Sequence, residues 1–169
     1  MRQSKSRNMT RCAIGAALMA LCAWITVPSP IPFTLQTLAA ALIPGLLGGK
    51  LGFCSVAVYL GLGAAGLPVF SGFQGGLGIL MGATGGYLLG FLVECLLFWL
   101  LENHLRQPVL MILGLFSCYI FGTAWYYFLY GSQSVLAIAS VCVFPFVLPD
   151  LCKIFIALYL CRRLKPHLP

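Results

Sequence analysis

The stretch Pro145-Phe-Val-Leu-Pro-Asp-Leu-Cys-Lys153 places one acid and one base inside a long apolar run near the C-terminal end. Asp150 and Lys153 are three residues apart, so on a helix their side chains share one face. A charge in the hydrocarbon of a membrane costs about 2.5–3.5 kcal/mol even on the mildest scales. Because apolar residues would be less costly there, the pair favours a polar ligand site. An ion pair that only neutralises itself and a proton or ion pathway are the alternatives.

The composition around this stretch is that of an integral membrane protein. Of the 169 residues, 61% are hydrophobic and 8% are charged, whereas a soluble domain carries about 25% charged residues. A membrane-spanning helix needs about 20 apolar residues. We therefore predict an all-α membrane protein with six transmembrane helices, at about residues 12–27, 33–49, 51–67, 77–101, 109–130 and 135–162.

The basic residues predict the orientation of these helices. In a six-span arrangement, nine of the ten basic residues fall on one side, and the tenth is Lys153 within a span. By the positive-inside rule this side is cytoplasmic, so both termini are expected in the cytoplasm. We predict a basic cytoplasmic tail at residues 1–11 and one membrane domain at residues 12–165, located in the cell (inner) membrane. The dispersed charges do not favour a nucleic-acid partner.

The depth of the acid follows from helix geometry. Twelve residues separate Asp150 from Arg162, which corresponds to about 18 Å of helix. Because the hydrocarbon core is about 30 Å thick, Asp150 is expected beyond the midplane, in the outer half of the membrane. We expect Pro145 and Pro149 to interrupt or restart the helix just before it, as happens where helices line a cavity.

Three further polar residues are candidates for the same site. Thr34 and Gln36 stand at the outer start of the second apolar segment, where they either cap the helix or offer hydrogen bonds at the depth of Asp150. Gln74 lies in a glycine-rich outer loop at residues 71–76, which could close over a ligand. Glu94 lies within the fourth segment, where it either faces the helix bundle or extends towards the cytoplasm.

Small residues at regular spacing predict close helix packing. Gly78, Gly82, Gly86 and Gly90 recur every four residues, which gives one smooth helix face. On the first segment, small residues recur four apart as Ala13 with Ala17 and as Ala16 with Ala20. Between helices of one chain this spacing is ordinary packing, whereas on a lipid-facing surface it could dock another membrane subunit.

Enzyme and metal-binding functions find little support in the sequence. It contains no HExxH motif and no acidic cluster, and its two histidines fall at cytoplasmic boundaries. The eight cysteines form no CxxC pair, so we expect free, mostly buried thiols and no metal site.

Several motifs together resemble one known family. They are Pro30-Ile-Pro-Phe-Thr-Leu-Gln-Thr37, Gly66-Leu-Pro-Val-Phe-Ser-Gly72, Gly75-Gly-Leu-Gly78, Gly85-Gly-Tyr-Leu-Leu-Gly-Phe91 and the stretch from Pro145 to Lys153. In this order they are similar to the BioY family, the biotin-specific S components of energy-coupling-factor (ECF) vitamin transporters. The similarity covers nearly the whole chain.

The resemblance implies a non-enzymatic membrane subunit that captures biotin from outside. In such systems a transmembrane coupling subunit and two cytoplasmic ATPases supply the energy. The acid and base of the family's last helix match Asp150 and Lys153, and a polar residue of its outer loop corresponds to Gln74. The family's docking helix for the coupling subunit matches Ala13, Ala16, Ala17 and Ala20. Its basic ligand contact on the fourth helix has no counterpart, since residues 84–101 contain no Arg or Lys.

The chemistry of biotin leads to a specific hypothesis. Asp150 can accept a hydrogen bond from a ureido N–H, and Lys153 can donate one to the ureido oxygen. A carboxylate beside Asp150 would be repelled, so we expect the valerate tail to be held by Gln36, Gln74 or loop amides. A stand-alone secondary permease for a small organic anion or zwitterion is the alternative function, and a structural or assembly protein is a third.

Overall fold

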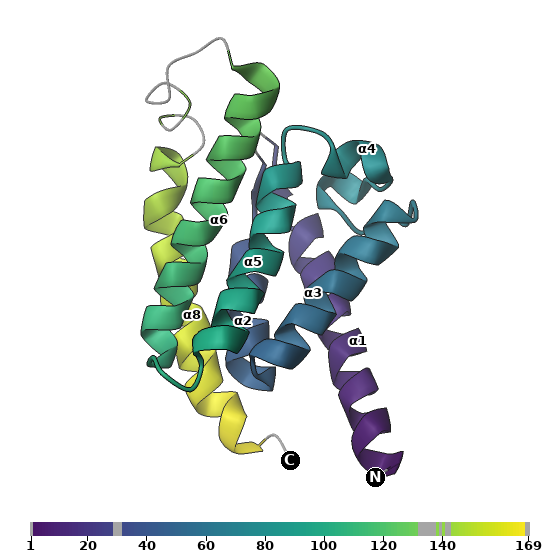
Figure 1. Cartoon of the computed structure of the whole chain (residues 1–169), viewed down its shortest axis with the longest axis vertical. Coiled ribbons are helices and arrows are strands. Elements are labelled where there is room, and N and C mark those ends of the chain that lie inside the picture. Colours follow the sequence, from purple (N-terminus) through teal and green to yellow (C-terminus); the bar gives the residue numbers. More distant parts are fainter. Residues whose placement is uncertain (1, 29–31, 132–137, 139, 141–142, 168–169) are drawn as a thin grey trace.

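The computed structural model describes residues 2–28, 32–131, 138, 140 and 143–167. Long helices run roughly along one axis, and both chain ends lie at the same end of the molecule (Figure 1). The long helices are α1 (Arg2–Trp24), α2 (Gln36–Leu47), α3 (Gly49–Ala64), α5 (Gly85–Leu101), α6 (Gln107–Tyr130) and α8 (Phe144–Leu164). The short elements are β1 (Thr26–Val27), β2 (Phe33–Thr34), η1 (Ser71–Phe73), α4 (Leu77–Leu80) and η2 (Lys165–His167).

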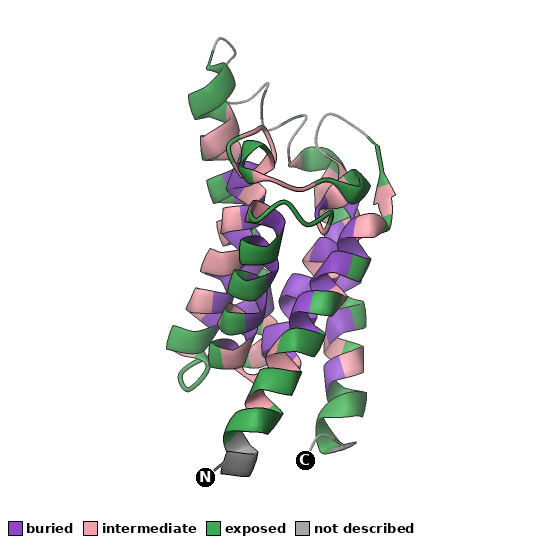
Figure 2. Ribbon diagram, turned by 90° about the vertical axis from the view of Figure 1, so that its right-hand side faces the viewer, coloured by how far each residue is buried: buried purple, intermediate pink, exposed green. Residues whose placement is uncertain are grey.

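Helix α2 holds the bundle together, because it contacts α1, α3, α5, α6 and α8. Its buried positions include a run of three alanines from Ala39 to Ala41, whose small side chains allow neighbouring helices to approach closely. The buried residues lie on the helix faces turned towards one another, and exposed residues cover the outside (Figure 2). The core therefore runs along the axis of the bundle.

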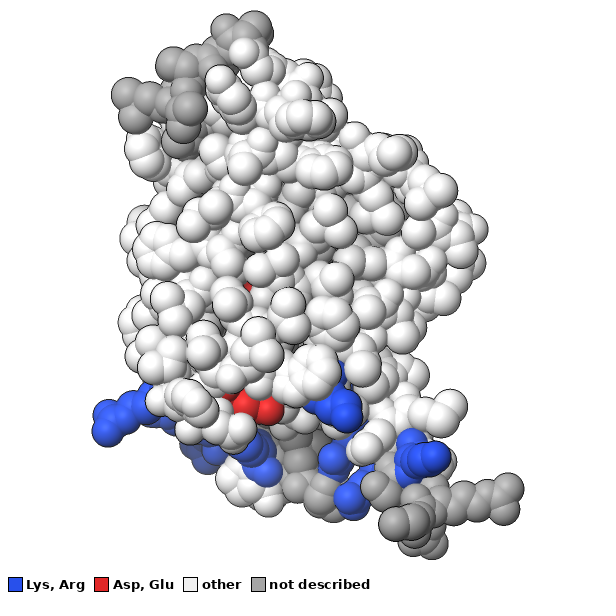
Figure 3. All heavy atoms as spheres, in the orientation of Figure 1, with Lys and Arg blue, Asp and Glu red and all other residues white. Residues whose placement is uncertain are grey.

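The outer surface of the bundle is apolar. Large apolar side chains such as Phe128 and Leu148 are 82% and 75% exposed. The visible charges gather at the end that carries both termini, below a broad surface without charge (Figure 3). Within the described residues, α6 and α8 are each long and apolar enough to cross a membrane, while α2, α3 and α5 are apolar but shorter. This surface is that of a helical membrane protein, because soluble proteins rarely expose large apolar patches.

The N-terminal half differs in two details from the predicted segments. The basic tail predicted at residues 1–11 is continuous with the first helix, because α1 begins at Arg2. This helix ends at Trp24, and β1 then pairs antiparallel with β2, with Thr26 opposite Thr34. Within the described residues, the strands of the structure are therefore limited to this very short hairpin between α1 and α2.

The fourth predicted segment, residues 77–101, is also divided. The short helix α4 and a turn precede α5, so Gly78 and Gly82 do not continue the glycine face of α5. At Gly85 a Cβ atom would collide with the backbone of Leu80, so the turn requires glycine there. Gly86 and Gly90 do pack against α6, where a Cβ at Gly90 would lie 2.9 Å from the Cα of Cys118.

The prolines of the C-terminal helix do not interrupt it. Helix α8 begins at Phe144, so Pro145 occupies its first turn, where no backbone donor is needed. Pro149 lies inside the continuous helix and removes one backbone hydrogen bond. Of the two predicted alternatives, the helix starts at this point, at Phe144, and is not interrupted at Pro149. Of the sixth predicted segment, residues 135–137, 139, 141 and 142 lie outside the described part.

Candidate ligand-binding site

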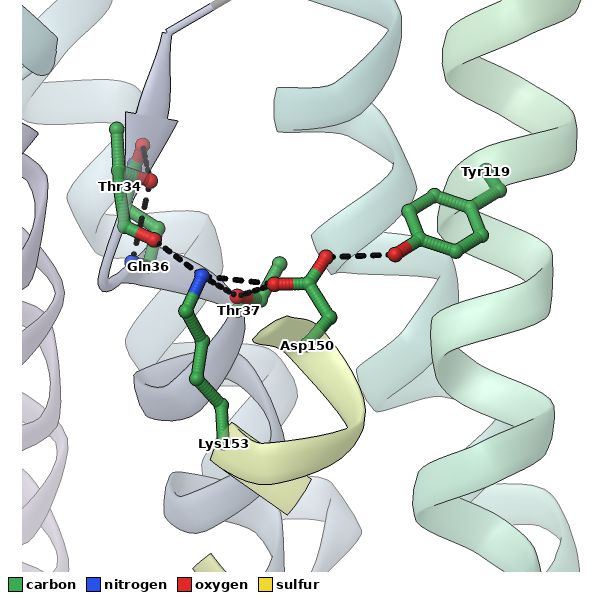
Figure 4. A network of polar contacts seen from close by, with 6 residues as sticks. All are labelled: Thr34, Gln36, Thr37, Tyr119, Asp150 and Lys153. Carbon is green, nitrogen blue, oxygen red and sulfur yellow. Dashed lines mark hydrogen bonds and ion pairs between the residues drawn. The ribbon is translucent and has the colours of Figure 1, made fainter. Parts of the chain in front are cut away.

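The acid and base of α8 form a buried ion pair in the interior of the bundle. The Nζ atom of Lys153 lies 2.7 Å from Oδ1 of Asp150. Asp150 is 2% exposed and Lys153 is 5% exposed. Since the two residues occupy successive turns of one helix face, α8 presents both charges in the same direction, towards α2 and α6 (Figure 4).

Both oxygens of Asp150 accept further hydrogen bonds. Oδ1 also accepts one from the hydroxyl of Thr37 on α2, at 2.9 Å. Oδ2 accepts one from the hydroxyl of Tyr119 on α6, at 2.7 Å. An ionised carboxylate offers about four acceptor positions, so three of them are filled and one remains on Oδ2.

The ammonium group of Lys153 uses all three of its donors. Besides Asp150, it donates to the backbone carbonyl oxygen of Thr34 at 2.7 Å and to the hydroxyl of Thr37 at 3.0 Å. The ring of Phe33 lies beneath it, with 3.9 Å between Nζ and the ring centroid, which is a favourable cation–π distance. Lys153 thus joins α8 to strand β2 and to the start of α2.

Thr34 and Gln36 form a second polar group that anchors the start of α2 to α3. The hydroxyl of Thr34 donates to Oε1 of Gln36 and accepts from its backbone N–H, both at 3.2 Å. Nε2 of Gln36 donates to the hydroxyl of Tyr59 at 2.7 Å. Both Gln36 and Tyr59 are buried, so the amide of Gln36 is already engaged inside the protein.

A cavity of about 100 Å³ lies next to these groups. Its polar wall includes Asp150 and Lys153, and its apolar wall comes from the rings of Phe70, Phe91 and Phe146. The cavity is completed by residues of the hairpin region, α2, the outer loop, α4, α6 and the start of α5: Pro32, Thr34, Gln36, Thr37, Ser71, Gln74, Ile79, Thr84, Tyr87, Leu88, Cys118 and Tyr119. A polar end and an aromatic wall suit a ligand with a hydrogen-bonding head and an apolar body.

The outer loop that contains Gln74 closes one side of this cavity. Gln74 is exposed and lines the cavity at the same time. The ring of Phe73 stacks on Trp24, with 5.0 Å between centroids, and the hydroxyl of Ser71 donates to that of Thr26 at 3.0 Å. Positive φ angles of 70° at Gly72 and 98° at Gly76 need glycine. The loop is thus tied to the hairpin region at the end of α1.

The predicted site residues are therefore brought to one cavity. Asp150, Lys153, Thr34, Gln36 and Gln74 all line it. The sequence analysis missed Thr37 and Tyr119, which bind Asp150 directly. A signal existed for Thr37, because it lies three residues after Thr34 in the same motif, but a tyrosine in an apolar segment such as Tyr119 carried none.

The remaining candidates lie elsewhere. Of the four alanines of the first helix, Ala16 and Ala20 are 4% and 7% exposed and belong to the core, whereas Ala13 and Ala17 are exposed. Glu94 is 3% exposed and packs against Gly114 of α6, so it faces the bundle and does not extend to the cytoplasm. Within the described residues no cluster of His, Cys, Asp or Glu could hold a metal ion.

The fold and the site together define a small helical membrane protein built around a buried, hydrogen-bonded acid–base pair at a small internal cavity. The sequence model of the BioY family matches residues 1–169, and the chain belongs to this family. The family resemblance seen in the sequence motifs is thereby confirmed.

Relatives and a solved structure agree with this assignment. The chain is 36% identical to the biotin transporter BioY of Thermotoga maritima, over 94% of this chain and 96% of the relative. It is 34% identical to the probable biotin transporter BioY of Pyrococcus horikoshii, over 95% and 98%. A crystal structure of the S-component for biotin from an ECF-type ABC transporter superposes with a TM-score of 0.87 at 26% identity, covering 98% of this chain and 94% of that one.

Proposed function

We propose that this chain is a biotin-binding membrane subunit that mediates biotin uptake as the S component of an ECF-type transporter. The observation that carries the proposal is the buried Asp150–Lys153 pair at the cavity of a whole-chain BioY family member. The names of the relatives and the likeness to a biotin S-component support it. The protein binds and delivers its ligand and catalyses no reaction.

The ureido ring of biotin fits the polar end of the cavity. The open acceptor position on Oδ2 of Asp150 takes one ureido N–H. The three donors of Lys153 are all in use, so it can reach the ureido oxygen only by releasing one of its present partners. The carbonyl of Thr34 is the partner whose release costs least, because both other bonds attach Lys153 to the Asp150 network.

The valerate tail is assigned to the outer loop. Gln36 is engaged with Tyr59 and Thr34, and the Ser71 hydroxyl donates to Thr26, which leaves Gln74 as the better placed polar side chain. Since residues 84–101 contain no Arg or Lys, the tail carboxylate is held here by neutral donors. Ligand pockets usually measure about 300–1,000 Å³, whereas this cavity has about 100 Å³, so the outer loop has to move as biotin enters.

The membrane arrangement completes the proposal. The protein then crosses the cell (inner) membrane six times, with both termini in the cytoplasm. In this arrangement the basic end of the molecule lies on the cytoplasmic side of the membrane, and the loop of Gln74 lies outside. The shared location of both termini and the visible charges supports this orientation (Figure 3). Ala13 and Ala17 then form the exposed stripe for a coupling subunit that works with two cytoplasmic ATPases, while Ala16 and Ala20 pack inside.

Equilibrium binding of radiolabelled biotin to the purified protein tests the function. We expect saturable binding by the wild type and at least about tenfold weaker binding by Asp150→Asn, which loses a charge-assisted bond of about 1.5–3 kcal/mol. Glu102→Gln is the matched control, because this acid lies at the opposite end of the bundle and lines neither wall of the cavity. Absence of saturable binding by the wild type would overturn the proposal.

Competition by biotin amide tests the placement of the tail. If Asp150 and Lys153 both serve the ureido ring, amidation of the carboxylate weakens wild type and Lys153→Ala by the same factor. If only Lys153→Ala becomes indifferent to amidation, Lys153 holds the carboxylate and the proposed orientation is wrong. Uptake by this chain alone that collapses with the proton gradient would instead indicate a secondary permease.

A further inference from the structure

We infer that Tyr119 is a specificity-determining residue, which restricts Asp150 to a single N–H donor from the ligand. The inference rests on the proposed function, in which Asp150 faces the ureido ring. Tyr119 would act through Asp150 as a positioning residue, and the ligand property that it selects is the number of parallel N–H groups offered to the carboxylate.

The hydrogen bonds around Asp150 carry the first step. Thr37 and Lys153 fill both acceptor positions of Oδ1, and Tyr119 fills one of the two on Oδ2. An ionised carboxylate has about four such positions, so one is left. Without the tyrosine hydroxyl, Oδ2 would offer two neighbouring positions to the cavity.

The surroundings of Tyr119 hold its hydroxyl in place. The residue is 7% exposed and belongs to an apolar cluster with Leu115 and Ile154. One side of Tyr119 lines the ligand cavity, and it also lines an apolar groove between α6 and α8 with Ile120 and Val147. The restraint comes from the apolar cluster that packs around the ring, so its bond to Asp150 persists when a ligand enters.

Ligand chemistry gives the consequence. In a cyclic urea the two N–H bonds diverge, so only one can point at a given oxygen. In a cyclic guanidinium, a ring N–H and the exocyclic N–H are parallel, so one oxygen with two free acceptor positions can accept both, whereas one free position accepts only one of them. With Tyr119 present, Asp150 satisfies the urea and leaves one donor of the guanidinium unpaired, which is costly in a buried site.

The test compares biotin with 2-iminobiotin, its guanidinium analogue, as competitors of radiolabelled biotin on the purified full chain. We expect Tyr119→Phe to lower the ratio of the dissociation constant of 2-iminobiotin to that of biotin by at least about tenfold, or about 1.4 kcal/mol. The attraction of the cation to Asp150 and its repulsion by Lys153 occur in both proteins, so they cancel in the change of the ratio.

Tyr127→Phe is the matched control. It removes the same hydroxyl two turns along the same helix, from a residue that is 46% exposed and lines the groove but not the cavity. Its ratio should equal that of the wild type. If Tyr119→Phe weakens both ligands by one common factor, the residue only packs and the inference is overturned.

A second variant covers the case in which Tyr119→Phe does not remain folded in detergent. Thr37→Val frees an acceptor position on Oδ1, so it should also lower the ratio of the dissociation constant of 2-iminobiotin to that of biotin. An unchanged ratio in this variant also overturns the inference. Failure of the wild type to bind biotin at all would refute the proposed function instead, so the two failures are distinguishable.

Discussion

Replacing Lys153 by methionine tests whether the acid and base stabilise the fold as one unit. Methionine keeps the apolar stem of comparable length but removes three hydrogen bonds, to Asp150, to the Thr34 carbonyl and to the Thr37 hydroxyl. It leaves Asp150, which is 2% exposed, as a buried charge without its cation. Breaking a buried pair in this way costs about 3–5 kcal/mol, and a lone charge in a membrane costs about 2.5–3.5 kcal/mol. We therefore expect the free energy of unfolding to fall by about 3 kcal/mol or more.

The partner variant Asp150→Asn should cost a similar amount, because it leaves the ammonium of Lys153 unpaired. In the double variant neither charge remains, and the asparagine can still accept a hydrogen bond from one of the Thr37 and Tyr119 hydroxyls through its oxygen and donate one to the other through its NH2 group. The double variant should therefore lose about as much stability as one single variant, with a coupling energy of about 2–3 kcal/mol, at the upper end for contacting residues.

Reversible unfolding in mixed detergent micelles measures these free energies, and biotin binding is measured on the same samples. Stability should return in part in the double variant, whereas biotin binding should stay lost, because in the proposed binding mode both groups contact the ureido ring. Strictly additive losses of stability would refute the view that the pair acts as one unit. Recovery of binding in the double variant would show that the charges do not contact the ligand.

Two further changes probe the helix packing and the end of the bundle that carries both termini. Gly86→Ala should lower the free energy of unfolding by about 1–3 kcal/mol, because the new methyl would collide with Trp125 and lie 2.9 Å from the carbonyl of Phe121. Gly61→Ala, where nothing lies within 4 Å of the new atom, should instead be neutral or stabilise by up to about 1 kcal/mol, and equal effects would refute the packing argument. Glu102→Gln should lower the free energy of unfolding by about 0.3–1 kcal/mol, because Oε2 of Glu102 accepts the Gly49 N–H at 2.8 Å at the start of α3. An unchanged free energy of unfolding at low salt would refute this expectation.

The helical membrane class and the polar pair could be predicted from the sequence, because both depend on local properties. Hydropathy and turn residues locate most of the long helices, and helix periodicity alone places Asp150 and Lys153 on one face. The number of spans stays a prediction. The family also followed from motifs, since those motifs carry the turns and the site together.

The errors arose where tertiary contacts override local pattern. The strands β1 and β2 have two residues each, too few for any periodicity. The break between α4 and α5 depends on a close approach of Gly85 to Leu80, which hydropathy does not record. The partners of Asp150 lie 113 and 31 residues away in sequence, at Thr37 and Tyr119, so only the folded chain brings them together.

The polar network also links ligand binding to the outer hairpin. Lys153 holds β2 through the carbonyl of Thr34, and β2 pairs with β1 at the end of α1. Ser71 of the outer loop bonds to Thr26 of β1, so the hairpin and this loop form one connected rim around the cavity. If biotin takes a donor of Lys153, the rim loses one of its attachments to α8. The same exchange that recognises the ureido oxygen would then loosen the rim that has to move for the ligand to enter.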